Sequence, residues 1–158
     1  MNVLSSAGLR AAMPAATRAE IVRLARGWIG TPYHHQASNR GVGADCLGLV
    51  RGVWRELYGQ ETEEPSPYTR DWAEASGEET LLAAARRHLL EIDSAAAAPG
   101  DVLVFRLRAL APAKHAAILV TAKAMVHAME GAPAAEVSLA PWWRRRTAAG
   151  FSFPGVLN

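Results

Sequence analysis

The sequence contains a single cysteine, Cys46, and its surroundings are those of a nucleophile. Cys46 follows a glycine-bearing loop and stands in the first turn of a predicted helix, with Asp45 in the N-cap position. Backbone N–H groups and the positive end of a helix favour thiolate over thiol, and the same groups can bind the oxyanion that forms when a carbonyl is attacked. The pattern therefore predicts attack of Cys46 on a carbonyl carbon.

A cysteine nucleophile needs a base within hydrogen-bond reach, and the sequence offers five histidines: His34, His35, His88, His115 and His127. The first two lie in the loop before Cys46 and the third in a predicted helix, whereas His115 and His127 lie on two consecutive predicted strands. If a three-residue turn (121–123) joins these strands, Ala117 lies opposite His127, and the two histidines become diagonal neighbours on one face. A turn with an even number of residues would place them on opposite faces.

This register predicts a papain-type mechanism. His115 takes the thiol proton and later donates it to the leaving amine, while His127 orients the His115 ring through its other nitrogen. A neutral histidine in the third position holds the tautomer but stabilises charge less than an aspartate. Two alternatives are a cysteine buried for packing and a zinc ion bound by Cys46, His115 and His127, although no short ligand spacing supports zinc. We expect no metal and no cofactor.

Helical and strand patterns divide the chain into two parts. Helices are predicted at 17–28, where Thr17 and Glu20 have capping-box spacing, at 46–58, ended by Gly59, and from Ser76 onward, with a buried stripe made of Leu81, Leu82, Ala85, Leu89 and Leu90. Strands are predicted at 101–105, 115–120 and 124–129. Helices followed by strands indicate an α+β domain with an antiparallel sheet.

Composition and charge narrow the class of protein. A chain of 158 residues with 50% hydrophobic and 20% charged residues is typical of one globular domain. A formal net charge of +2 is too small to indicate a nucleic-acid partner, and no apolar run approaches the roughly 20 residues that span a bilayer. Residues 1–16 lack the features of a signal peptide, so we expect an N-terminal arm and synthesis in the cytoplasm.

The order and spacing of several short motifs resemble the NlpC-type family of cell-wall peptidases. The matching runs are Gly30-Thr31-Pro32-Tyr33, Asp45-Cys46-Leu47-Gly48-Leu49-Val50, Pro99-Gly100-Asp101, Lys114-His115-Ala116-Ala117-Ile118 and Val126-His127-Ala128. Two further features, Gly52-Val53-Trp54-Arg55-Glu56-Leu57 and the aromatic and arginine-rich segment 141–158, are similar to the branch found in phage tail tips and gene transfer agents.

The resemblance implies a papain-like single domain over 17–158, with N-terminal helices packed on a central antiparallel sheet. It implies hydrolysis of the bond between the side-chain carboxyl of D-glutamate and the diamino acid in peptidoglycan stem peptides. Cys46 is then the nucleophile, His115 the base and His127 the orienting residue. Tyr33 and Asp45 match family residues that shape the site and recognise a free amine, and the Cys46 N–H matches a donor of the oxyanion hole.

One residue departs from the family pattern, because Leu47 stands where serine usually follows the cysteine. The position lies near the substrate pocket, so Leu47 bears on the choice of bond. The phage branch further implies tail-tip partners and action in the recipient periplasm. Two alternative functions remain open: a structural tail-tip or plug protein with the same fold, and a thioester-forming acyltransferase or amidase.

Overall fold

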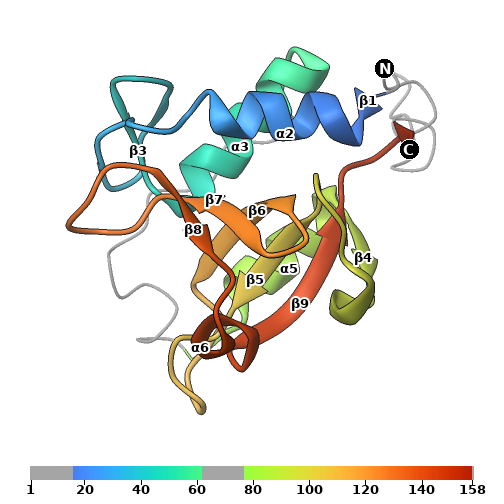
Figure 1. The fold of residues 1–158 in the computed structure, drawn as a ribbon. Helices are drawn as coiled ribbons and strands as arrows, with labels where there is room; N and C mark the ends of the chain where they lie inside the picture. The colour runs from blue at the N-terminus through green and yellow to red at the C-terminus, as the bar shows by residue number, and fades with distance from the viewer. Residues whose placement is uncertain (1–15, 62–76, 158) are drawn as a thin grey trace, which may run out of the picture.

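The computed structural model describes residues 16–61 and 77–157, and its centre is an antiparallel sheet (Figure 1). The helices are α2 (Arg18–Arg26), α3 (Cys46–Tyr58), α5 (Thr80–His88), α6 (Pro141–Arg144) and the 3-10 helix η1 (Ser94–Ala96). The strands are β1 (Ala16–Thr17), β2 (Ser38–Asn39), β3 (Gly43–Ala44), β4 (Leu90–Ile92), β5 (Val102–Phe105), β6 (His115–Thr121), β7 (Ala124–His127), β8 (Ala135–Ser138), β9 (Thr147–Ser152) and β10 (Val156–Leu157). The predicted combination of helices and an antiparallel sheet is confirmed.

Six strands form the central sheet in the order β4-β9-β5-β6-β7-β8, and every neighbouring pair is antiparallel. The order is not sequential because β9, from the C-terminal part of the chain, inserts between β4 and β5. The sequence analysis did not predict β4, β8 or β9. The predicted segment 141–158 therefore includes α6 and a central strand.

Two apolar clusters cover the two faces of the sheet. On one face, side chains of α2, α3 and α5 pack against side chains of β5 and β6. The buried residues there include Ile21, Val53 and Leu81 from the helices and Val104 and Ile118 from the strands. On the other face lies a smaller cluster of Leu103, Phe105, Ala117, Leu119, Met125 and Leu139, with Trp143 of α6 packed against it. Because side chains alternate along a strand, His115 and His127 share this second face with Ala117 and Met125.

The ends of α2 and α3 follow the capping signals in the sequence. Thr17 caps α2, since its hydroxyl accepts a hydrogen bond from the Glu20 N–H at 3.1 Å. Asp45 caps α3, which ends at Gly59 in the left-handed conformation, with φ of 84°. The predicted bounds of α3 are confirmed, whereas α2 starts as predicted but ends at Arg26, with Gly27 as its C-cap, rather than at residue 28.

The third helix differs from its prediction at both ends. Ser76 lies outside the described residues, and α5 begins at Thr80. The Glu79 side chain does not cap this helix but accepts hydrogen bonds from Arg106 and from the Ala113 N–H. Leu89 is buried as predicted, whereas Leu90 is 39% exposed, because the chain has already turned into β4.

The β6–β7 hairpin reaches the predicted pairing by a different route. Thr121 pairs with Ala124, so the turn has two residues rather than the predicted three. A bulge between Leu119 and Thr121 adds one residue to β6, and beyond it Ile118 pairs with Val126. The bulge shifts the register by the one residue that the shorter turn removes, so His115 and His127 still lie on one face.

The predicted arm 1–16 lies outside the described residues except for Ala16. This residue is buried in β1, which pairs in parallel with β10. No helix among the described residues is long and apolar enough to cross a membrane.

Candidate active site

Cys46 is held at the first turn of α3 by the carboxylate of Asp45. Asp45 Oδ1 accepts a hydrogen bond from the Gly48 N–H at 2.7 Å, and Oδ2 accepts one from the Gln36 N–H at 2.8 Å. Gln36 has a φ of 65°, the left-handed region that non-glycine residues seldom adopt. The buried Asp45 carboxylate thus links the preceding loop to the first turn of α3 and fixes the position of Cys46 at the start of that helix.

Gly48 permits the close contact between this loop and α3. A Cβ at residue 48 would lie 1.8 Å from the carbonyl oxygen of Ala37, which belongs to the backbone and cannot rotate away. Ala37 O also accepts a hydrogen bond from the Asp45 N–H. The glycine therefore lets the loop pack directly on the first turn of α3, next to the nucleophile.

The histidine pair is joined by a hydrogen bond, as the predicted register requires. His115 Nε2 and His127 Nδ1 are 2.9 Å apart, and both residues are buried. For His115 Nδ1 to accept the thiol proton, its Nε2 must carry a hydrogen and donate it to His127. His127 then carries its own hydrogen on Nε2. The prediction that the two histidines share a face is confirmed, while their catalytic roles stay predictions.

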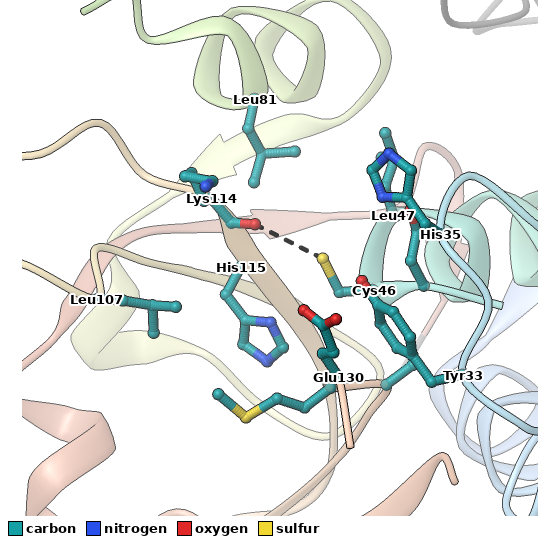
Figure 2. A pocket seen from close by; sticks show the side chains of 12 residues that line it. Tyr33, His35, Cys46, Leu47, Leu81, Leu107, Lys114, His115 and Glu130 are labelled. Carbon is teal, nitrogen blue, oxygen red and sulfur yellow. Dashed lines mark hydrogen bonds between the residues drawn. The ribbon is translucent and has the colours of Figure 1, made fainter. Parts of the chain in front are cut away.

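A pocket of about 220 Å³ brings most of the predicted site residues together (Figure 2). Five of its lining residues were predicted: Tyr33, Asp45, Cys46, Leu47 and His115. His127 is absent from the lining and reaches the pocket through its bond to His115. The cysteine comes from α3 and the histidine from the first residue of β6, so the pocket lies where the helix N-terminus meets the end of a strand.

Seven other residues line this pocket and were not predicted to do so: His35, Leu81, Leu107, Lys114, Ala128, Met129 and Glu130. Leu81 was predicted as core, and His35 was assigned only to the loop. Ala128 was quoted within a motif but not as a lining residue. Glu130 comes three residues after His127, and this proximity was the available signal. The pocket wall therefore combines leucine side chains with carboxylates and imidazole.

The thiol of Cys46 is directed at the backbone of the neighbouring strand (Figure 2). Its Sγ lies 3.6 Å from the carbonyl oxygen of Lys114, to which it donates a hydrogen bond, and the residue remains partly exposed to the pocket. No hydrogen bond joins Cys46 to His115 in the part of the chain that the structure describes. Cys46 and His115 therefore share one pocket, while the Cys46 thiol is directed at a backbone carbonyl.

The thiol is less acidic than the sequence predicted. Burial, and secondly the negative charge of Asp45, raise the pKa of Cys46 to about 12, against a lowering effect of the backbone N–H groups of Ala116, Leu47 and Cys46. The backbone N–H groups at the helix N-terminus lower the pKa of Cys46 as expected, but burial and the neighbouring carboxylate outweigh them.

Burial favours the neutral form of both imidazoles. Burial, and secondly the neighbouring His127, lower the pKa of His115 to about 3, and burial also lowers the pKa of His127. A neutral His115 has a free lone pair, as a base requires. These shifts favour a neutral thiol and neutral imidazoles in this pocket.

The sequence matches the model of the NlpC/P60 family over residues 30–150, which is more than half of the chain. The chain belongs to the NlpC/P60 family. The matched range contains Cys46 together with both histidines of the pair. A search of the curated proteins finds no match.

Solved structures from this family share the fold. The chain is 23% identical to the NlpC/p60 domain of the peptidoglycan hydrolase SagA, with a TM-score of 0.61, over 87% of this chain and 100% of that domain. An NlpC/P60 family protein from Bacillus cereus gives 15% identity and a TM-score of 0.65 over 90% of this chain and 42% of that one. NlpC1 from Trichomonas vaginalis is 16% identical, with a TM-score of 0.57, over 87% of this chain and 44% of that one. The chain thus spans all of the SagA domain but under half of the other two. These matches confirm the predicted NlpC-type papain-like fold.

A zinc ion bound by Cys46, His115 and His127 was one alternative to catalysis. Within 16–61 and 77–157, no group of three or more His, Cys, Asp or Glu side chains is arranged to hold a metal ion. The geometry that is present, a cysteine at a helix N-terminus and a hydrogen-bonded pair of histidines, fits acyl transfer through a thioester.

Proposed function

We propose that this chain is a cysteine peptidase that hydrolyses peptidoglycan stem peptides. The observation that carries the proposal is the meeting of Cys46 and the bonded His115–His127 pair in one pocket. Membership of the NlpC/P60 family supports it, as does the likeness in fold to a domain of a peptidoglycan hydrolase. The bond we propose joins the side-chain carboxyl of D-glutamate to the diamino acid.

The proposed reaction begins with a neutral Cys46 thiol and a neutral His115 imidazole. His115 Nδ1 takes the proton of Cys46 as Sγ attacks the carbonyl carbon of the scissile amide, and the oxyanion accepts a hydrogen bond from the Cys46 N–H. The carbon–nitrogen bond then breaks, and the leaving amine takes the proton from His115. Sulfur and carbonyl carbon are left joined as a thioester.

Hydrolysis of the thioester completes the cycle. The oxygen of a water molecule attacks the thioester carbon while His115 takes a proton from that water, and the carbon–sulfur bond then breaks. The proton returns to Sγ, and the new carboxyl group leaves the pocket. His127 stays neutral throughout and holds His115 in the tautomer that leaves Nδ1 free for each transfer.

Substrate recognition is assigned to the pocket walls. Both oxygens of Asp45 accept backbone hydrogen bonds, so Asp45 shapes the loop, and its charge also faces the pocket, where we propose that it attracts the free amine of a stem peptide. Tyr33 lines the same wall, while Leu47 and Leu81 make the apolar part. Leu47 in place of serine favours an aliphatic over a polar group at that position.

The place of action that we propose is the tail tip of a phage-like particle, which delivers the enzyme to the recipient periplasm after synthesis in the cytoplasm. The similarity of residues 52–57 and 141–158 to that branch supports this role, and tail-tip proteins are its partners. Release of the chain from purified particles by denaturation, detected by mass spectrometry, tests it. Absence from particles of a strain that makes the protein would contradict it.

The enzymatic proposal is tested by mass spectrometry of diaminopimelate-type peptidoglycan after incubation with wild-type protein and with Cys46→Ala. We expect new fragments cut after D-glutamate with the wild type only. His88→Ala is a matched control, because His88 lies on α5 outside the pocket, and it should digest like the wild type. Folded wild-type protein that releases no fragments would overturn the enzymatic proposal in favour of a structural role.

A further inference from the structure

The indole of Trp143, on the short helix α6, packs against both histidines of the pair. Its ring is stacked on His115, with centroids 5.3 Å apart and planes inclined by 28°. It meets His127 edge to face at 5.4 Å and Phe105 at 5.0 Å. One side chain from the C-terminal part of the chain thus contacts the base, the residue that orients the base, and the cluster beneath them.

Several hydrogen bonds fix α6 in this place. The Arg144 guanidinium donates to the carbonyl oxygens of Leu139 and Ala122, the latter in the β6–β7 turn. The Thr147 hydroxyl donates to the Trp143 carbonyl at 3.2 Å, and the Arg106 N–H donates to the Arg146 carbonyl at 2.8 Å. The backbone around Trp143 is therefore tied to the hairpin that carries both histidines and to the end of β5.

The stacked geometry matters because His115 must become positive during the reaction. When His115 takes the thiol proton it becomes an imidazolium in a buried site, and its hydrogen-bond partner is the neutral ring of His127 rather than a carboxylate. A cation within about 6 Å of the centroid of an aromatic face is attracted by the ring quadrupole, most strongly for tryptophan. The Trp143 face lies within that distance of His115.

We propose that Trp143 is a positioning residue of this site: its indole face fixes the His115 ring toward Cys46 and stabilises the imidazolium that forms when the thiol proton is transferred. This inference rests on the proposed function of Cys46 and His115. It gives Trp143 part of the charge-stabilising role that an acidic third residue would have.

Other ionisable groups also face the reacting pair. These groups are Cys46 on α3, Asp45 at its N-cap, His35 in the preceding loop, Lys114 before β6, His127 on β7 and Glu130 after it. These groups come from other elements and are unchanged by a substitution at 143. The guanidinium of Arg146, on the same side of the fold, lies over Trp142 at 3.7 Å from its ring centroid.

Trp142 provides a matched control. It is the neighbouring tryptophan of the same helix, its ring touches Trp143 at 4.8 Å, and it is 43% exposed. Of these two tryptophans, Trp143 is the one whose ring contacts both histidines. A substitution at 142 therefore changes the same helix without removing the stacked face.

Two assays test the inference. The first measures kcat and KM for a stem-peptide amide, and the second measures the rate of alkylation of Cys46 by iodoacetamide as a function of pH. Alkylation reports on one thiol, since Cys46 is the single cysteine. With Trp143→Leu we expect both kcat and the alkylation rate near neutral pH to fall about tenfold, with KM nearly unchanged. Trp143→Phe should recover much of the loss, and Trp142→Leu should match the wild type.

Replacement of Trp143 by ring-fluorinated tryptophans keeps the shape of the side chain but withdraws electron density from its face. If Trp143→Leu fails to fold, these variants still test the inference, with the same replacements at 142 as controls. We expect kcat and the alkylation rate to fall with each added fluorine at 143 only. Wild-type rates in folded Trp143→Leu, equal losses in Leu and Phe variants, or rates insensitive to fluorination would each overturn the inference.

The alkylation arm separates this inference from the proposed function. A wild-type protein that releases no peptidoglycan fragments but whose alkylation depends on Trp143 would overturn the proposed function and support the inference. Active wild-type protein with rates independent of residue 143 would overturn the inference and leave the function standing.

Discussion

Cys46 and His115 meet in one pocket, but they are positioned by different kinds of contact. The start of α3 is fixed by neighbours in sequence: Asp45 binds the N–H groups of Gly48 and Gln36, and Gly48 lets Ala37 approach. His115 is fixed by other elements of the fold, since His127 of β7 and Trp143 of α6 pack on it. A nucleophile at a helix N-terminus needs local contacts, whereas its base depends on tertiary packing.

The largest loss of stability should come from adding a side chain at Gly48, where the loop contacts the first turn of α3. In Gly48→Ala, the new methyl group would lie 1.8 Å from a backbone oxygen, so the loop or the helix must move. We expect a loss of roughly 3 kcal/mol or more in the free energy of unfolding, because overpacking against backbone exceeds the gain in helix propensity. Thermal and urea unfolding would measure it.

Gly150→Ala on β9 is the matched substitution in the sheet. There a Cβ would lie 3.0 Å from Ser94 Cα, a tight contact that a small shift can relieve. We expect a smaller loss than at Gly48. Equal losses at the two positions would show that the cysteine side is no more rigidly built than the sheet.

Acid pH should destabilise the histidine side specifically. The folded-state pKa of His115 is about 3, below its ordinary value near 6.5, so the unfolded chain binds more protons between these values. The contribution of His115 is therefore complete above pH 6.5 and is lost as pH falls toward 3, with a slope of up to about 1.4 kcal/mol per pH unit for one proton.

Urea unfolding of wild type and His115→Gln over this pH range measures that slope. The glutamine variant, which does not titrate there, should have a shallower dependence, and His88→Ala serves as the control on α5. The activity of the wild type should also persist below pH 6.5, because His115 stays a neutral base there. A stability profile of His115→Gln parallel to that of the wild type would contradict the assignment.

Removing the partner of the base should lower turnover while the fold persists. His127→Ala deletes the acceptor that holds the tautomer of His115, and we expect kcat to fall about 10- to 100-fold with KM little changed. His127→Asn, which keeps an oxygen acceptor, should lose less. Stem-peptide cleavage would be followed by chromatography, and wild-type kcat in His127→Ala would count against the tautomer role.

The smallest effect should come from neutralising Asp45. Asp45→Asn loses one of two accepted backbone hydrogen bonds, which costs about 1 kcal/mol of unfolding free energy. It also removes a charge that raises the pKa of Cys46, so that pKa should fall. Faster iodoacetamide alkylation at pH 8 would report the change, with Glu56→Gln as a control away from the pocket. An unchanged rate would assign the low acidity of the thiol to burial alone.

The difference between the two sides also explains what the sequence could predict. The bounds of α3 follow from Asp45 and Gly59, which act on adjacent turns, and they match the prediction. The three-residue turn at 121–123 was wrong, because a bulge in β6 depends on how three strands fit together. His115 and His127 were nevertheless paired correctly, since the bulge and the shorter turn offset each other.

The environment of the site was harder to predict than its residues. Trp143 was assigned only to an aromatic and arginine-rich segment, and nothing near it in sequence indicates that α6 folds back onto the histidines. The helix position of Cys46 and the adjacent Asp45 are visible in the sequence, but the burial that contributes most to raising the pKa of Cys46 is not. The run Gly52-Val53-Trp54-Arg55-Glu56-Leu57 serves packing here: a Cβ at Gly52 would lie 2.0 Å from the Trp28 ring, whose Nε1 donates to Glu56.

The parallel pairing of β1 with β10 has a practical consequence. Ala16 lies opposite Val156, so the described chain enters and leaves the domain side by side. In Figure 1 this pair lies on the right, whereas β3, which leads into Cys46, lies on the left. A group attached where the described chain enters and leaves the domain, beside the β1–β10 pair, would therefore lie on the side of the fold away from β3. Attachment at that pair should leave the pocket beside the start of α3 open to a large polymer.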